Sequence, residues 1–273
     1  MTLVDAVGRR HAPAGSDVRI VSLVPSITEL VCDLGLGAHL VGRTGFCIHP
    51  RERVRRVAKV GGTKDVDLPR LRALGPTHVI VNVDENRRET VDELARFVPH
   101  VIVTHPLGPR DNLALYRLIG GVFGREAEAE GLCERFERAY AACERAAGSF
   151  APKRVLYLIW RKPWMTVSRD TYISRTLALV NWRTVPDAAA DRYPEVALDE
   201  TTLAGVDAVL ASSEPFPFRA RDVDALRALP ELGGRAVALI DAEMTSWYGS
   251  RAIAGFEYLP RFRRALESVP YPP

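Results

Sequence analysis

The sequence predicts an α/β fold with two lobes, each built on a parallel sheet, and one long helix that joins them. Short runs rich in Val and Ile recur without polar alternation, which is typical of strands buried on both faces of a parallel sheet. Stretches of helical periodicity separate these runs, as in repeated strand–helix units. One strand-free segment in the middle of the chain divides the runs into two groups, which indicates two lobes.

The first lobe is expected to contain four buried strands. They are Arg19–Val24, His39–Gly42, His78–Val83 and Val101–Val103. The helix after the first strand has a start signal, because Glu29 follows Ser26 by three residues, as in a capping box. Gly35 and Gly37 signal its end.

The strand-free segment, residues 111–148, is expected to form a short helix and a longer one, divided by Gly120, Gly121 and Gly124. The longer piece, Arg125–Ala147, is amphipathic, with Leu132, Phe136, Tyr140 and Cys143 at three- and four-residue spacing. At 1.5 Å per residue it would be roughly 35 Å long, enough to join two lobes. The predicted organisation is an N-terminal lobe over residues 1–124, a connecting helix over 125–148 and a C-terminal lobe over 149–273.

The second lobe repeats the pattern of the first. Its expected strands are Arg154–Ile159, Asp207–Ala211 and Ala236–Ile240. The segments LGPTHVIV (Leu74–Val81) and LAGVDAVL (Leu203–Leu210) both combine a helix end, a Gly-containing turn and a buried strand. This similarity favours two pseudo-equivalent lobes over one continuous sheet.

Composition excludes several classes of protein. The chain of 273 residues has 37 basic and 34 acidic residues, a net charge of only +3, and no basic stripe of the kind that binds nucleic acid. It has no apolar run of about 18 residues that could insert into a membrane. The first 19 residues lack the apolar core of a secretory signal, so the location is cytoplasmic as the sequence stands, or periplasmic or cell-surface if a leader has been removed. A monomer is expected.

Catalytic and metal-binding motifs are missing from the sequence. The glycines of Leu34–Gly42 do not match GxGxxG, and Gly61–Lys64 does not match a phosphate loop. The six histidines show no HExxH spacing, the four cysteines show no CxxC spacing, and there is no GxSxG elbow. We therefore predict a binding protein with no metal and no intrinsic cofactor, rather than an enzyme.

Aromatic residues gather where predicted strands end, which is where α/β lobes bind their ligands. Phe46 follows the second strand, Trp160 and Trp164 follow the strand 154–159, and Trp247 and Tyr248 follow the last strand. Flat apolar faces with polar rims are typical of small-molecule sites. The polar segment Asn82–Arg88, after the third strand, is either a solvated loop or part of the rim of such a site.

The segments RIVSLVPSITELVCDLGLGAHLVGRT and VGGTKDVDLPRLRALGPTHVIV resemble the helical-backbone (class III) substrate-binding proteins of ABC importers. The resemblance runs from about Asp5 to Leu266 and is closest to the cobalamin-binding branch, whose relatives carry ferric siderophores or haem. It implies two Rossmann-like lobes with a rigid connecting helix at Arg125–Ala147. It also implies an inter-lobe ligand cleft with aromatics at Phe46, Trp160, Trp164 and Trp247.

Similar proteins carry one carboxylate on each lobe that pairs with arginines of a membrane permease. Glu200 matches the second of these carboxylates. The first would fall at Pro69, in DLPRL, so this docking charge is missing unless Asp67 replaces it. The missing carboxylate leaves open the alternative that the protein is a cytoplasmic relative that no longer serves a permease.

Three ligand classes follow from the resemblance. The leading hypothesis is cobalamin or a related corrinoid, with Arg161, Glu85 and Asn86 bonding the amide rim. A ferric siderophore would require convergent arginines, for which Arg43, Arg87 and Arg161 are available, and haem would require a ligand such as Tyr248. A cofactor-handling protein or enzyme on the same fold is the alternative from another class.

Overall fold

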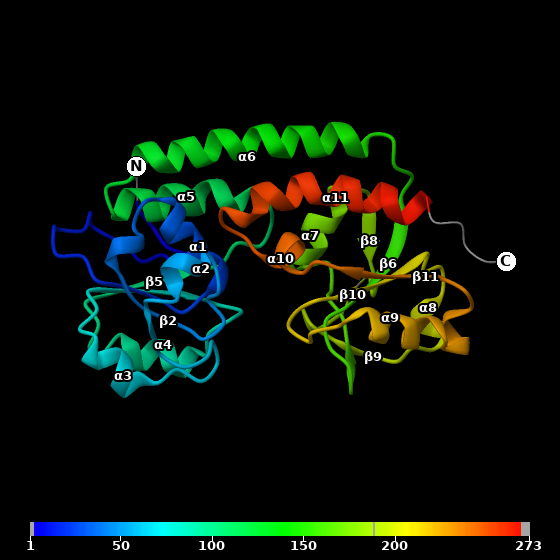
Figure 1. Ribbon diagram of the computed structural model, residues 1–273, viewed down its shortest axis with the longest axis horizontal. Helices are drawn as coiled ribbons and strands as arrows, with labels where there is room; N and C mark the ends of the chain where they lie inside the picture. Colours follow the sequence, from blue (N-terminus) through cyan, green and yellow to red (C-terminus); the bar gives the residue numbers. More distant parts are fainter. Residues whose placement is uncertain (1–2, 188, 269–273) are drawn as a thin grey trace. The chain divides into compact units, whose positions relative to one another are not determined.

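The computed structural model describes residues 3–187 and 189–268, which form two compact units (Figure 1). The first unit comprises the described residues up to Pro106 together with 110–136 and 248–251. The second comprises 107–109, 137–247 and the described residues from Ala252. The division falls inside the long helix α6 (Glu126–Ala147), between Phe136 and Glu137.

The first unit is built on a five-stranded sheet in which every neighbouring pair of strands is parallel. The strand order is β3-β2-β1-β4-β5, with β1 in the centre. The strands are β1 (Ile20–Ser22), β2 (Leu40–Arg43), β3 (Ala58–Lys59), β4 (His78–Asn82) and β5 (His100–Thr104). The chain moves outward from β1 on one side and then returns to the other, so the topological switch point lies between β1 and β4.

Helices cover both faces of this sheet. Figure 1 shows α1 and α5 on one side of the sheet and α3 and α4 on the other. The helices are α1 (Pro25–Asp33), the 3-10 helix η1 (Gly37–His39), α2 (Arg51–Val54), α3 (Leu68–Ala73), α4 (Arg88–Leu94) and α5 (Asp111–Val122). Val21, Val79 and Val101 pack with Leu71 of α3 and Leu94 of α4 in one buried cluster.

The second unit has a four-stranded parallel sheet in the order β11-β10-β6-β8, and a separate antiparallel pair, β7-β9. Its strands are β6 (Lys153–Leu158), β7 (Trp164–Met165), β8 (Trp182–Thr184), β9 (Glu195–Val196), β10 (Ala208–Ser212) and β11 (Ala236–Ile240). Its helices are α7 (Tyr172–Ala178), α8 (Glu200–Leu203), α9 (Ala220–Arg227), the 3-10 helix η2 (Pro230–Leu232), α10 (Glu243–Ser246) and α11 (Arg251–Ser268). The strand order places the switch point between β6 and β10.

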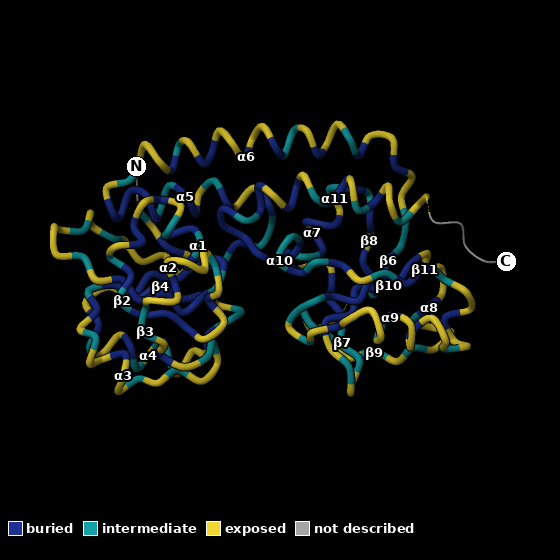
Figure 2. The backbone as a smooth tube through the Cα atoms, in the orientation of Figure 1, coloured by how far each residue is buried: buried dark blue, intermediate teal, exposed yellow. Residues whose placement is uncertain are grey.

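The predicted α/β fold is confirmed, with two parallel sheets and one long helix. All seven expected strands are present, and Figure 2 shows their backbones as mostly buried. Among the described residues, no helix is both long and apolar enough to cross a membrane.

The predicted capping box at the start of α1 is wrong. The N-cap is Val24, which makes no side-chain cap bond, and Ser26 lies inside the helix with 1% of its surface exposed. Glu29 instead accepts two hydrogen bonds from Arg251, at 2.7 and 2.9 Å. The sequence matches the capping-box pattern, but the helix begins at Pro25, two residues earlier than an N-cap at Ser26 requires.

Two of the three glycines expected to divide the middle segment do not break a helix. Gly120 and Gly121 both lie inside α5, and the chain turns at Gly124, whose φ is +63°. A Cβ on Gly120 would lie only 2.5 Å from the Ala129 Cβ of α6. Gly120 is therefore required for the close approach of α5 and α6, not for the turn between them.

Candidate functional site

The topological switch point of the first unit carries Asn86, which follows β4. Its side-chain oxygen accepts a hydrogen bond from the backbone N–H of Asn82 at 2.9 Å. Its amide nitrogen donates to the carbonyl of Leu23, at the end of β1, and to the carbonyl of Thr63, at 3.3 and 2.9 Å. Asn86 is only 5% exposed, so in this structure it ties three loops together, and direct contact with a ligand stays a prediction.

Glu85 and Tyr248 lie together in the first unit. The Tyr248 hydroxyl donates to the Glu85 carboxylate at 2.6 Å, and the tyrosine is 7% exposed. Burial and the adjacent Glu85 carboxylate raise the pKa of Tyr248 well above its usual value. The phenol is therefore held in its neutral, hydrogen-bonding form.

The segment 248–251 is anchored to the first unit by further hydrogen bonds. The N–H of Gly249 donates to the Asn112 side chain at 2.6 Å, and the Tyr116 hydroxyl donates to the Gly249 carbonyl at 2.8 Å. Gly249 has a φ of +79°, and a Cβ there would lie 3.2 Å from the Ser26 carbonyl oxygen. These contacts fix the backbone that carries Tyr248.

Phe46, in the loop after β2, is the most exposed large apolar side chain among the described residues, with 64% of its surface accessible. The N–H of Gly45 donates to the Gly61 carbonyl at 2.7 Å, which holds this loop against the turn that Asn86 also binds. The Phe46 ring lies over Gly62, where an added Cβ would be 3.4 Å away. An aromatic face in contact with water is thus presented from a fixed loop.

Four aromatic side chains gather in the second unit at the carboxyl ends of β6 and β10. The Trp160 ring meets Phe216 edge to face at 5.6 Å, and Trp164 stacks on Phe218 at 6.3 Å with an interplanar angle of 7°. Phe216 and Phe218 are themselves 4.7 Å apart. Trp160 is 39% exposed, so this cluster, Trp160, Trp164, Phe216 and Phe218, has an apolar surface at the switch point.

Arg161 is held beside this aromatic cluster. Its guanidinium lies 5.8 Å from the Trp164 ring and 6.0 Å from the Phe216 ring. It also donates to the Asp222 carboxylate at 2.8 Å. The second oxygen of Asp222 accepts the backbone N–H of Arg219, so the carboxylate that holds Arg161 is fixed at the start of α9.

Trp247 is less accessible than expected for a cleft aromatic. It is 7% exposed, and its indole N–H donates to the Glu214 carboxylate at 3.1 Å. Glu214 follows β10, so the bond joins the carboxyl end of that strand to the segment after α10. A contact between Trp247 and a ligand stays a prediction.

The two expected docking carboxylates lie at helix N-termini, but at different positions of the helix start. Glu200 is exposed at the first position of α8, directly after Asp199, which caps that helix by accepting the N–H of Thr202 at 2.8 Å. Asp67 caps α3 in the same way, by accepting the N–H of Arg70 at 3.0 Å. Asp67 therefore matches the capping residue Asp199 rather than Glu200.

Sequence reasoning missed Phe216, Phe218, Glu214 and Asp222. The two aromatic residues could have been found, because the run EPFPF follows the predicted strand 207–211 after only two serines and obeys the same junction rule as the other aromatics. The carboxylate partners could not be found this way, since their pairing depends on loop geometry. Among the described residues, no group of three or more His, Cys, Asp or Glu side chains is arranged to hold a metal ion.

The chain is similar in sequence to vitamin B12-binding proteins. It is 19% identical to that of Photorhabdus laumondii over 202 residues, which covers 74% of this chain and 73% of the relative. It is 22% identical to that of Pectobacterium atrosepticum over 187 residues, 67% of each chain.

Solved structures share the fold. A periplasmic vitamin B12-binding protein of Vibrio cholerae has a TM-score of 0.77 at 16% identity, covering 92% of this chain and 98% of its own. A periplasmic haem-binding protein of a Roseiflexus species has a TM-score of 0.80 at 24% identity, covering 91% and 99%. The family model described as periplasmic binding protein matches residues 20–234. The chain therefore belongs to the periplasmic binding protein family, whose members bind solutes and are not enzymes.

Proposed function

We propose that this protein binds cobalamin or a related corrinoid reversibly, as the substrate-binding protein of an ABC importer. The observation that carries the proposal is the pair of accessible aromatic surfaces at the carboxyl edges of the two sheets. Phe46 supplies one surface and Trp160, packed on Phe216, supplies the other. A corrinoid has a broad apolar macrocycle, which such surfaces can cover.

The polar groups beside these aromatics suit an uncharged ligand rim. Each charged or strongly polar group already has a partner: Tyr248 bonds Glu85, Arg161 bonds Asp222, and Trp247 bonds Glu214. The periphery of a corrinoid is mostly amide groups, which both donate and accept hydrogen bonds. Amide groups can therefore form hydrogen bonds to these pairs, and no unpaired charge of the protein has to be desolvated.

The arginines do not favour a ferric siderophore. Arg43 is 5% exposed, and its guanidinium donates to the backbone carbonyls of Val54 and Thr44 at 3.0 Å each. Arg87 pairs with Asp65 at 3.2 Å, and Arg161 pairs with Asp222. An anionic complex would have to compete with a carboxylate at both remaining arginines.

Tyr248 is a poor candidate for an axial ligand to haem iron. Ligation would require the phenolate, whereas burial and Glu85 raise the pKa of this tyrosine. The hydroxyl would also have to leave a 2.6 Å hydrogen bond. Both facts support a corrinoid ahead of haem.

Isothermal titration with cyanocobalamin, haemin and a ferric siderophore tests the proposal directly. We expect saturable binding of cyanocobalamin at micromolar concentration or below, and at least tenfold weaker binding by Phe46→Ala and by Trp160→Ala. Leu239→Ala serves as the control, because Leu239 is a partly exposed apolar residue of β11, 38% accessible, that belongs to neither aromatic surface. Saturable binding of haemin without binding of cyanocobalamin would overturn the proposal.

A further inference from the structure

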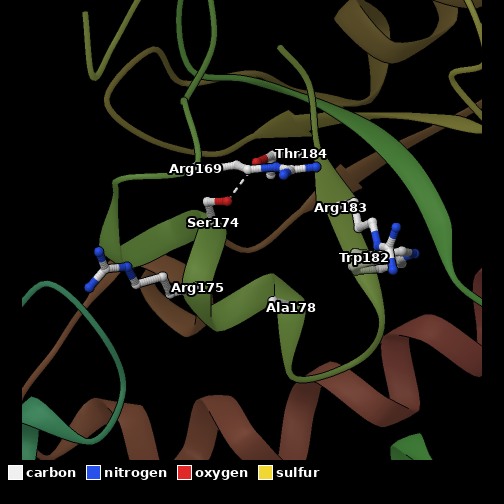
Figure 3. Close-up of a pocket in the computed structure, with 7 residues that line it drawn as sticks. All are labelled: Arg169, Ser174, Arg175, Ala178, Trp182, Arg183 and Thr184. Atoms are coloured by element: carbon white, nitrogen blue, oxygen red, sulfur yellow. Dashed lines mark hydrogen bonds between the residues drawn. The ribbon is translucent and has the colours of Figure 1, made fainter. Parts of the chain in front are cut away.

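The second unit contains a cavity that none of the residues discussed so far lines. It has a volume of about 440 Å³ and lies between α7, the edge strand β8 and the segment before α7 (Figure 3). This volume is in the range of sites for small organic molecules. The cavity therefore has room for a ligand larger than an inorganic ion.

The wall of the cavity is rich in hydrogen-bond donors. Arg169 and Arg183 line it, and Figure 3 shows their guanidinium groups on two sides of the space, whereas Arg175 extends away from it. Arg169 bonds Asp187 at 2.9 Å through one of its five N–H groups. Arg183 is exposed, and its side chain makes no hydrogen bond or ion pair within the described residues.

Two further donors belong to buried residues of the wall. The hydroxyls of Ser174 and Thr184 lie 2.6 Å apart, so one donates to the other and the second hydrogen is left for another acceptor. Trp182 is 1% exposed, and its indole N–H has no acceptor within residues 3–187 and 189–268. Buried donors without acceptors are uncommon in folded proteins.

Negatively charged side chains are missing from the same wall. No carboxylate is among the residues that line the cavity. Asp187 is shared, because it also pairs with Arg154 at 3.0 Å, and Asp170 bonds Arg175 at 2.6 Å. The cavity therefore has an excess of positive charge and of donors, beside the buried side chain of Trp182.

We propose that this cavity binds a small organic anion, a molecule with a carboxylate or phosphate group on a compact apolar body. The anionic oxygens accept from Arg183 and Arg169, which are suited to oxygen pairs, and the apolar body lies on the side of the cavity lined by Ala178 and Trp182. This site is separate from the proposed corrinoid site, and its existence does not depend on that proposal.

Titration calorimetry at low ionic strength tests the site with phenyl phosphate, benzoate and the uncharged benzyl alcohol. We expect saturable binding of at least one anion, no binding of the alcohol, and at least tenfold weaker anion binding by Arg183→Ala. Because Arg183 is exposed and has no partner to lose, this variant is expected to fold normally. Arg221→Ala, at an exposed arginine of α9, is the matched control and should bind like the parent protein.

An independent measurement follows the indole N–H of Trp182 by nuclear magnetic resonance with labelled tryptophan. The anion should shift this signal while leaving that of Trp160 unchanged, and cyanocobalamin binding by Arg183→Ala should equal that of the parent protein. Equal heats for the anions and the alcohol, or an unchanged anion affinity in Arg183→Ala, would overturn the proposal. Benzoate and phenyl phosphate separate the carboxylate preference from the phosphate preference.

Discussion

At the scale of single residues, Asp5 shows how one buried carboxylate can organise a whole segment. Its two oxygens accept from the N–H groups of Val7, Arg9 and Val103 at 2.9 to 3.1 Å, and from His11 at 3.1 Å. The N–H of Ala6 donates in turn to the Val103 carbonyl at 2.9 Å. The N-terminal segment is thereby attached to the edge strand β5.

Replacing Asp5 should therefore destabilise the protein more than its place near the end of the sequence suggests. We expect Asp5→Ala to lower the free energy of unfolding by about 3 kcal/mol, because several bonds to a buried charged group are lost at once. Urea denaturation followed by circular dichroism measures this. Asp17→Ala, at an exposed carboxylate, should change the stability by less than about 0.5 kcal/mol; equal losses in both variants would refute the role of Asp5.

His78 gives the molecule a dependence on pH. It is 5% exposed and stacks on His100 at 4.6 Å, and burial together with the neighbouring His100 and His11 lowers its pKa to about 4. The unfolded chain, with a histidine pKa near 6.5, takes up the proton first as the pH falls. The contribution of His78 to stability is thus complete above about pH 6.5 and is lost as the pH falls toward 4.

The expected loss from this residue is about 2 kcal/mol between pH 7 and pH 5. Urea denaturation at the two pH values measures it, and His78→Phe should reduce the difference by about that amount. His39→Gln, at a partly exposed histidine, provides the comparison. A pH dependence that is the same in the parent protein and in His78→Phe would contradict the assignment.

At the scale of helices and strands, the sequence predicted what depends on local patterns. The run Ala236–Ile240 was located to the residue, because its five residues form an uninterrupted apolar segment. The capping box at Ser26 and the helix break at Gly120 were wrong, because tertiary contacts decide both: Glu29 bonds Arg251, and Gly120 faces Ala129. The aromatic residues at strand ends could be predicted from the sequence, because the strands that they follow could be. The pairing of Arg161 with Asp222 could not be predicted, because it joins residues that meet only in the folded chain.

The α5–α6 contact gives a direct test at this scale. We expect Gly120→Ala to lower the free energy of unfolding by about 1 to 3 kcal/mol, because the new methyl group would overlap Ala129 and the Arg125 carbonyl, 2.5 and 2.8 Å away. Gly131→Ala is the matched control, since it lies in α6 with nothing within 4 Å of the added Cβ. That variant should stabilise the protein by up to about 1 kcal/mol. Thermal and urea denaturation of both variants measure the contrast, and equal effects would refute it.

At the scale of the whole molecule, binding and delivery of the ligand should be separable. Glu200 is exposed at the start of α8 and is not one of the residues of the aromatic cluster. We propose that it pairs with a permease, whereas Asp67 already uses one oxygen to cap α3. Charge complementarity of this kind acts on association more than on ligand affinity.

The corresponding prediction concerns Glu200→Arg. Its affinity for cyanocobalamin should equal that of the parent protein, while ligand uptake by cells that contain the cognate permease should fall at least tenfold. Glu231→Arg reverses an exposed charge elsewhere in the second unit and should leave uptake unchanged. Normal uptake with Glu200→Arg would remove Glu200 from the docking surface.

The place of residues 248–251 in the first unit limits how the chain can be cut into separately folding fragments. These residues belong to the first unit, although Trp247 and Ala252 on either side belong to the second. A fragment that ends at residue 148 would lack the partners that Glu29, Glu85 and Asn112 find in this segment. The first unit is completed only after residues 248–251 have been synthesised, so the first 148 residues do not by themselves encode all of it.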